Sequence, residues 1–235
     1  MSQYRELPPL IPEELIEKAS GFSTANICDG MNKLGLLAGH CMDKTIKPVS
    51  DKMRVIGTAC TVDTKDGDNF PLHLAIYSCK PGYVIVVGGK AYEERAYMGD
   101  LMGGAADAIG ISGIVVDGYV RDKDGLDRIG MPVFSRGFKP ASPVKKGPGG
   151  LNVPVLCGAV VVQPGDLIMG DYDGVVAVPR DRIEEVLAAA AEKVAYEGNR
   201  VDAIEEYRRC SRTGEPLPDL TPGWVKEMME KKEEI

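Results

Sequence analysis

YVIVVGGKAYEERAYMGDLMGGAADAIGISGIVVDGYVRD, residues 83–122, is the stretch that decides the fold. Residues 83–87 are β-branched and apolar enough for a buried strand, which we expect Gly88 and Gly89 to end. From Gly99 onward the apolar residues recur with a helical period, and Gly110 provides a C-terminal stop. The expected buried face of this helix comprises Leu101, Met102, Ala105, Ala106 and Ile109. A second apolar run, 114–117, is closed by Gly118, so the order strand, helix, strand predicts a βαβ unit.

Charged residues stand at the predicted helix start and after the second strand of this unit. Asp100 opens the helix, where its side chain can cap free backbone N–H groups at the positive end of the helix dipole. The helix of about eleven residues descends ~16 Å and the next strand climbs back, so Arg121 and Asp122 should end beside Asp100. The unit thus predicts a site for an anion and a cation together. Taken singly, the same residues suit a plain helix cap and a surface ion pair.

Three further segments accompany this arrangement: STANICDGMNKLG at 23–35, RVIGTACTV at 54–62 and VVQPGDLIMGDYDGVVAVP at 161–179. With an Asp separated by twenty residues from an Arg-Asp pair, they make the chain resemble the RraA-like proteins over about residues 20–200. That family includes the class II 4-hydroxy-4-methyl-2-oxoglutarate / 4-carboxy-4-hydroxy-2-oxoadipate aldolases and the regulator of ribonuclease activity A. The resemblance implies an α/β swivelling β/β/α fold, a mixed sheet core with flanking helices, assembled as a homotrimer or homohexamer.

Composition narrows the class of protein. The 235 residues are 44% hydrophobic, which supports a sizeable core, and 28 basic against 35 acidic residues give a net charge of −7. That charge argues against a general nucleic-acid or anionic-membrane surface. The six cysteines form no CxxC pair and no cluster with His40 or His73, so a zinc site is not expected. Without a secretory signal or a membrane-spanning run, we expect a cytoplasmic protein.

The order of patterns predicts one domain with helical ends. We expect an N-terminal helical arm over residues 1–36, the core over residues 37–198 and a C-terminal helical extension over residues 199–235. Within these, residues 123–130 (KDGLDRIG) indicate a loop, and the passage 123–154 should decide the substrate. Other expected elements are strands at 132–135, 155–162, 167–170 and 174–178, and separate helices at 179–195 and 201–210.

The resemblance also implies a chemistry. A divalent-metal-dependent aldolase cleaves a 4-hydroxy-2-oxo dicarboxylate to pyruvate, and oxaloacetate decarboxylation is a companion activity because it leaves the same pyruvate enolate. Gly99 and the N–H groups of Leu101 and Met102 would bind the substrate carboxylate, and Arg121 the carboxylate and keto oxygens. Asp122 would hold the metal, and Asp100 a water on it. Oxygen ligands with no histidine or cysteine nearby favour Mg²⁺ or Mn²⁺ with several waters kept.

Several assignments stay open. The family supplies a glutamate that reaches the metal waters of a neighbouring subunit, and Glu197 matches it best, with Glu192 the alternative and a solvated helix face the plain interpretation. No lysine is well placed for a Schiff-base mechanism, although Lys90 and Lys123 stand close to the site in sequence. Three polar residues are candidates for the distal end of a substrate or for a solvated loop: Glu93, Glu94 and Arg95. The other class of function is a non-catalytic, ring-shaped regulator that binds a ribonuclease.

Overall fold

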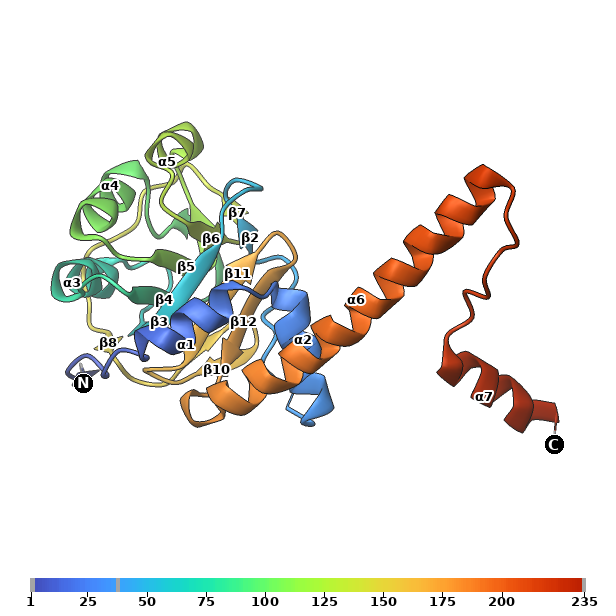
Figure 1. The fold of residues 1–235 in the computed structure, drawn as a ribbon. Helices are drawn as coiled ribbons and strands as arrows, with labels where there is room; N and C mark the ends of the chain where they lie inside the picture. Colours follow the sequence, from blue (N-terminus) through green and yellow to red (C-terminus); the bar gives the residue numbers. More distant parts are fainter. Residues whose placement is uncertain (1–2, 37–38, 234–235) are drawn as a thin grey trace. The chain divides into compact units, whose positions relative to one another are not determined.

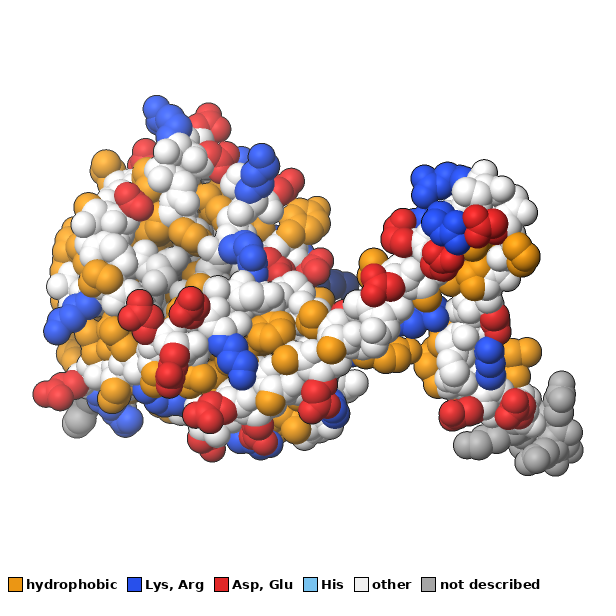
Figure 2. Space-filling view, in the orientation of Figure 1, with side chains coloured by type: hydrophobic (Ala, Val, Ile, Leu, Met, Phe, Trp, Pro, Cys, Tyr) orange, Lys and Arg blue, Asp and Glu red, His pale blue; other side chains and the backbone are white. Residues whose placement is uncertain are grey.

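The computed structural model describes residues 3–36 and 39–233 and divides them into two compact units, Met1–Ala190 and Ala191–Ile235. The first unit contains a ten-stranded mixed sheet with flanking helices, so the expected fold class is confirmed. The second unit consists of the remainder of a long helix and one short helix. On the face shown in Figure 2, acidic and basic side chains are interspersed with apolar ones.

Parallel strands form the middle of the sheet, and a helix follows each of the first three. In chain order the elements are β3 (Val55–Asp63), α3 (Phe70–Ser78), β4 (Tyr83–Ala96), α4 (Asp100–Ile109), β5 (Gly113–Val120), α5 (Lys123–Ile129) and β6 (Val133–Ser135). The three helices lie along one side of the sheet (Figure 1). Because the strands are parallel, their carboxyl ends and the starts of the following helices share one edge, as the βαβ pattern predicted.

Antiparallel strands complete the first unit. β11 (Leu167–Asp171) pairs with both β3 and β12 (Gly174–Val178), whereas β9 (Val155–Cys157) and β10 (Val160–Val162) form a separate hairpin. The expected single strand 155–162 is therefore wrong, because Gly158 and Ala159 turn the chain at positive φ. The remaining strands are short: β1 (Gln3–Tyr4), β2 (Lys47–Pro48), β7 (Gly137–Phe138) and β8 (Gly150–Leu151), of which β8 lies between β1 and β3.

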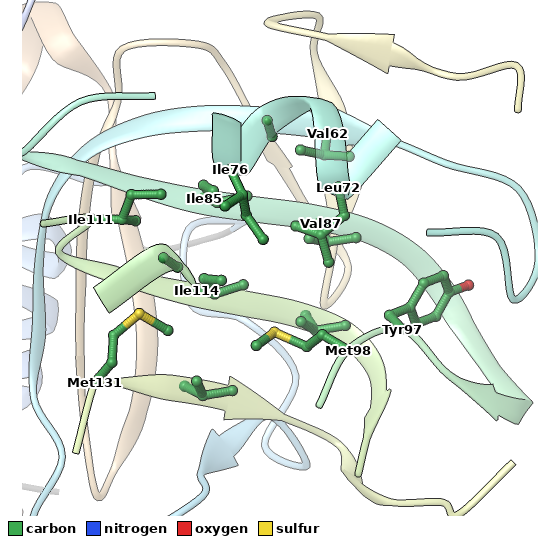
Figure 3. Packing of buried hydrophobic residues seen from close by; sticks show 14 of the residues in the cluster. Val62, Leu72, Ile76, Ile85, Val87, Tyr97, Met98, Ile111, Ile114 and Met131 are labelled. Atoms are coloured by element: carbon green, nitrogen blue, oxygen red, sulfur yellow. The ribbon is translucent and has the colours of Figure 1, made fainter. Parts of the chain in front are cut away.

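Alternating side chains of the strands separate the hydrophobic core into layers. Along β4, Ile85 and Val87 point into a cluster shared with α3, α4 and α5 (Figure 3), and Val84 and Val86 point into the cluster on the other face. That second cluster also holds side chains of β9, β10, β11 and β12. A strand buried on both faces has no polar alternation, which is why residues 83–87 are apolar throughout.

The N-terminal helices α1 (Glu13–Ser20) and α2 (Thr24–Lys33) lie in the first compact unit and pack against its sheet. Ser23 caps α2 in a reciprocal capping box with Asn26. Ile27 and Met31 of α2 are fully buried, in a third cluster with side chains of β11, β12 and the first turns of α6 (Ile183–Thr213). The burial of these apolar faces fixes both helices to the sheet.

Local expectations failed at two places that border the candidate site. β4 does not end at Gly88 and Gly89 but continues to Ala96, with Lys90 and Ala91 at φ 57° and 55° and a shift of register before Tyr92. Residues 123–129, expected as a loop, form α5, because Leu126 is buried against α4 and offsets the weak helix propensity of a glycine-containing, charged run.

The C-terminal helices also differ from expectation. Residues 180–182 form a short 3₁₀ turn, and α6 runs unbroken from Ile183 to Thr213, so the two expected helices are one. Gly198 lies inside it with open space around it, so the glycine lowers helix propensity without ending the helix. α7 spans Gly223–Glu233. Among the described helices, none has the length and apolar character that a membrane span requires.

Candidate active site

The start of α4 forms the first wall of the candidate site. Gly99 is the N-cap, in extended backbone at φ −142° and ψ −163°, and Asp100 is the first helical residue. The expectation that Asp100 caps the helix is wrong, since no side chain makes a cap hydrogen bond here. The N–H groups of the first turn, including those of Leu101 and Met102, therefore have no side-chain cap, and they form the positive end of the helix dipole.

The end of β5 brings in the charged pair. The backbone N–H of Arg121 donates to the Met98 carbonyl (2.9 Å), which joins the strand end to the residue before Gly99. Arg121 Nε donates to Asp122 Oδ2 (3.0 Å), and Arg121 Nη1 donates to Ser142 Oγ (2.7 Å). Asp122 has a left-handed backbone, φ 58°, and starts α5. Both charged side chains are about one third exposed and therefore available to a ligand.

Two glycines allow these segments to approach one another. A Cβ on Gly99 would lie 3.0 Å from Arg121 Cγ and 3.2 Å from Asp122 Cγ, and closer still to the Asp122 carboxylate. A Cβ on Gly125 would lie 2.5 Å from both Cβ and Oδ2 of Asp100. Neither glycine has a positive φ, so it is the absence of a side chain, and not backbone freedom, that both positions require.

A cavity of about 270 Å³ joins these walls. Its lining residues are Asn69, His73, Met98, Gly99, Asp100, Leu101, Met102, Arg121, Asp122, Ser142, Pro143 and Lys145. The structure therefore brings together Gly99, Asp100, Leu101, Met102, Arg121 and Asp122, as the spacing predicted. Sequence reasoning missed the opposite wall, which comes from α3 and from the passage 142–145. The only signal available was that Asn69 and His73 are four residues apart at a helix start.

Hydrogen bonds hold the missed wall in place. The backbone N–H of Asn69 donates to the Val144 carbonyl (3.0 Å), and that of Val144 donates to the Gly67 carbonyl (2.8 Å). The buried carboxylate of Asp68 accepts from the N–H of Lys146 (2.8 Å). The passage 123–154 was expected to decide the substrate. Its second half lines the cavity, and these hydrogen bonds to residues 67–69 hold it there.

The expectation that no histidine lies nearby is wrong, because His73 lines the cavity. Burial, and then the positive charge of Lys145, lower the pKa of His73 from its ordinary 6.5. The imidazole is therefore neutral at physiological pH, and it adds a neutral donor or acceptor to a cavity whose charged groups are Asp100, Arg121, Asp122 and Lys145.

One further expectation was wrong, and the neighbouring charged residues do not line the cavity. Leu101, expected on the buried face of α4, is 87% exposed, because the elements packed against the first turn contact Asp100 and Met102 rather than Leu101. Neither Lys90 nor Lys123 lines the cavity: they pair with Asp63 (3.8 Å) and Asp127 (2.6 Å). Glu93 and Glu94 are exposed and do not line it either, and Arg95 donates instead to the Ser142 carbonyl (2.7 Å).

The donor atoms of the cavity suit a cation that keeps most of its water. Within residues 3–36 and 39–233, no group of three His, Cys, Asp or Glu side chains could hold a metal ion alone. Asp100 and Asp122 offer two carboxylates in one cavity, which fits Mg²⁺ or Mn²⁺ better than a closed zinc site. Glu197 pairs with Lys193 (3.5 Å) in the second unit, which also contains Glu192, so a role for either at the site stays a prediction.

Comparison with known proteins adds a family. Residues 24–177 match the family model described as RraA-like, Aldolase/RraA. A protein of Halalkalibacterium halodurans named "Putative 4-hydroxy-4-methyl-2-oxoglutarate aldolase" is 42% identical over 70% of this chain and 79% of that protein. The crystal structure of an uncharacterized Pseudomonas syringae protein superimposes with a TM-score of 0.72 at 28% identity, over 84% of this chain and 95% of that one. Streptomyces coelicolor RraAS2, titled an unusual member of the RNase ES inhibitor RraA family, does so with a TM-score of 0.70 at 26% identity, over 80% and 96%.

Proposed function

The chain belongs to the RraA-like family, and from this premise we propose that it is a divalent-metal-dependent aldolase that cleaves 4-hydroxy-2-oxo dicarboxylates, such as 4-hydroxy-4-methyl-2-oxoglutarate, to pyruvate. One observation supports the proposal most: a single cavity contains the start of α4, the Arg121 guanidinium and the carboxylates of Asp100 and Asp122. Breaking a carbon–carbon bond beside a 2-oxo acid leaves negative charge on the keto oxygen, and these groups are suited to bind and stabilise it.

Different residues bind different parts of the substrate. The N–H groups of Leu101 and Met102, at the positive end of α4, bind the substrate carboxylate, and Gly99 leaves room for it. Arg121 donates to the carboxylate and keto oxygens, and Ser142 and Asp122 hold its guanidinium in one orientation. Pre-oriented donors of this kind stabilise developing charge without reorganisation during the reaction.

Mg²⁺ or Mn²⁺ is the cofactor that we propose for this site. Asp122 would hold the ion directly and Asp100 would hold one of its waters, with Glu197 of a neighbouring subunit as a third, water-mediated contact. When bound, the ion supplies Lewis acidity toward the keto oxygen. The Glu197 contact requires a homo-oligomer, a trimer or a hexamer, which we propose as the active form.

Oxaloacetate decarboxylation is the expected companion activity. Loss of CO₂ from oxaloacetate and loss of a ketone or keto acid from an aldol substrate leave the same pyruvate enolate. The groups that stabilise this enolate therefore serve both reactions. A site that binds only the pyruvyl half should therefore process both kinds of substrate.

Pyruvate release tests the proposal. Purified protein is given 4-hydroxy-4-methyl-2-oxoglutarate or oxaloacetate with Mg²⁺, Mn²⁺ or EDTA, and pyruvate is followed through lactate dehydrogenase. Pyruvate from the aldol substrate that is lost with EDTA, and lost again in Arg121→Ala, is the expected result. Pyruvate release from oxaloacetate alone would support the enolate chemistry of the site but would contradict the proposed aldol substrate. Full activity of Arg121→Ala or Asp122→Ala would refute the site.

A second candidate function is a protein-binding regulator of a ribonuclease. The observation that favours it is the likeness of the fold to RraAS2, whose title names an RNase inhibitor family. A pull-down with a ribonuclease of the E class, and an RNA-cleavage assay with added protein, test this candidate. Absence of pyruvate release together with inhibition of RNA cleavage would place the regulator first.

A further inference from the structure

Two polar atoms at the start of α3, in the cavity wall beside α4, have no hydrogen-bond partner in the described part of the chain. They are Asn69 Oδ1 and His73 Nε2, and both are closed to solvent. Asn69 is only 1% exposed. A buried polar atom without a partner destabilises the fold, so a pair of them in one cavity wall calls for a physical reason.

The orientation of the Asn69 amide is set by its neighbour. Asn69 Nδ2 donates to Met102 Sδ (3.3 Å), and a thioether accepts but does not donate. Oδ1 therefore points away from Met102 as an acceptor that needs a donor. The side chain serves no other purpose in the helix, because Asn69 is the N-cap of α3 but makes no side-chain cap hydrogen bond.

The chemistry of the two atoms selects a ligand group. A carboxylate oxygen cannot pair with Asn69 Oδ1, since both are acceptors. A hydroxyl group can donate its one proton to Asn69 Oδ1, and its oxygen can accept from His73 Nε2 in the tautomer that carries the proton on that nitrogen. Lys145, whose charge acts on His73, also lines the cavity and complements a carboxylate next to that hydroxyl.

Position relates this wall to the proposed substrate. Asn69 and His73 line the same cavity as the start of α4 and Arg121, so a ligand with its 2-oxo acid end at Arg121 extends toward them. Met102 of α4 contacts Asn69 and lines the same cavity, and a displacement of this unbranched side chain would open access to Asn69 Oδ1.

We propose that Asn69 and His73 form a subsite for the C4 hydroxyl group of a 4-hydroxy-2-oxo dicarboxylate and so determine specificity for aldol substrates. The inference rests on the proposed function. Oxaloacetate has no such hydroxyl group and does not use the subsite. Replacement of either residue should therefore affect aldol cleavage and not decarboxylation, because both reactions use the other groups of the cavity.

A matched pair of variants tests the subsite. His73→Leu removes the polar atom, whereas His73→Gln places an amide near the position of Nε2. We expect His73→Leu to lower kcat/KM for 4-hydroxy-4-methyl-2-oxoglutarate about ten- to hundredfold while oxaloacetate decarboxylation changes less than about twofold. His73→Gln should restore much of the loss, and Asn69→Leu should reproduce it. An equal fall with both substrates, or no fall with either, would overturn the subsite.

A binding measurement keeps the subsite testable if neither substrate is turned over. The probes are 2-hydroxy-2-methylbutanedioate and 2-methylbutanedioate, which differ only in the hydroxyl group, and calorimetry gives their affinities for wild-type protein and His73→Leu. We expect the hydroxylated probe to bind about tenfold tighter to the wild type, and the difference to vanish in the variant. Equal affinities in the wild type would refute the subsite, whereas absent turnover with this preference intact would refute only the aldolase.

Discussion

Replacement of Gly99 by alanine should disable the site without a change of charge. The added Cβ would lie 3.0 Å from Arg121 Cγ and 3.2 Å from Asp122 Cγ, tighter than ordinary carbon contacts, and closer still to the Asp122 carboxylate. The backbone at φ −142° suits any residue, so steric displacement of these two side chains is the main effect. The carboxylate must withdraw by roughly 1 Å, and a misplacement of that size costs about a hundredfold in rate.

The assay measures kcat/KM for oxaloacetate and for 4-hydroxy-4-methyl-2-oxoglutarate, together with the free energy of unfolding in urea. We expect both activities to fall about a hundredfold and stability to fall by about 1–3 kcal/mol, the usual cost of overpacking. Gly104→Ala is the matched control on the same helix, because its Cβ would meet only Ile129 Cδ1 at 3.8 Å. It should stabilise α4 by about 0.5–1 kcal/mol and leave both activities unchanged. Wild-type activity of Gly99→Ala would refute the assignment of Arg121 and Asp122.

Three shorter predictions follow from other contacts. Gly125→Ala should displace the carboxylate of Asp100, since its Cβ would lie 2.5 Å from Oδ2, and should lower stability by about 1–3 kcal/mol and both pyruvate-releasing activities with it; unchanged urea midpoint and rates would contradict this. Because the pKa of His73 is lowered in the fold, its contribution to stability is present above the ordinary value of 6.5 and is lost as pH falls through the lowered value. Between about pH 7.5 and 5.5 the free energy of unfolding in urea should therefore fall less in His73→Gln than in the wild type, and equal falls would refute the shift. Cys28 Sγ and Cys41 Sγ lie 3.0 Å apart, and the hydrogen bond from Cys28 lowers the pKa of Cys41 to about 7, so oxidised glutathione should convert the pair to a disulfide with release of reduced glutathione; intact-mass measurement that finds both thiols free would exclude it.

The wall missed by sequence reasoning shows where local patterns stop being informative. Ser142 and Lys145 follow Arg121 by a passage rich in proline and glycine, and no periodicity links them to Asn69 and His73. They meet because backbone groups of the passage 141–146 bond to residues 67–69 and to the end of β4. Such bonds join segments far apart in the chain, and many sequences could make them.

The exposure of Leu101 has a similar cause. Helical periodicity places Leu101 on the same face as Met102 and Ala105, but it does not say how far along the helix the neighbouring elements reach. Here Gly125 of α5 lies against Asp100, and Asn69 at the start of α3 contacts Met102, whereas Leu101 between them is left 87% exposed. A hydrophobic side chain at that point is exposed even though the pattern is regular.

By itself the sequence determined the βαβ unit and the meeting of Asp100 with Arg121 and Asp122. Parallel strands bring strand ends and helix starts to one edge, and glycines at the junctions permit the approach, so the short-range pattern suffices. Only the tertiary structure decided that β4 continues to Ala96, that residues 123–129 are helical, and that Asn69 and His73 face the site. Those outcomes depend on burial and on hydrogen bonds between distant segments, whose free energies outweigh the local preferences that a sequence pattern expresses.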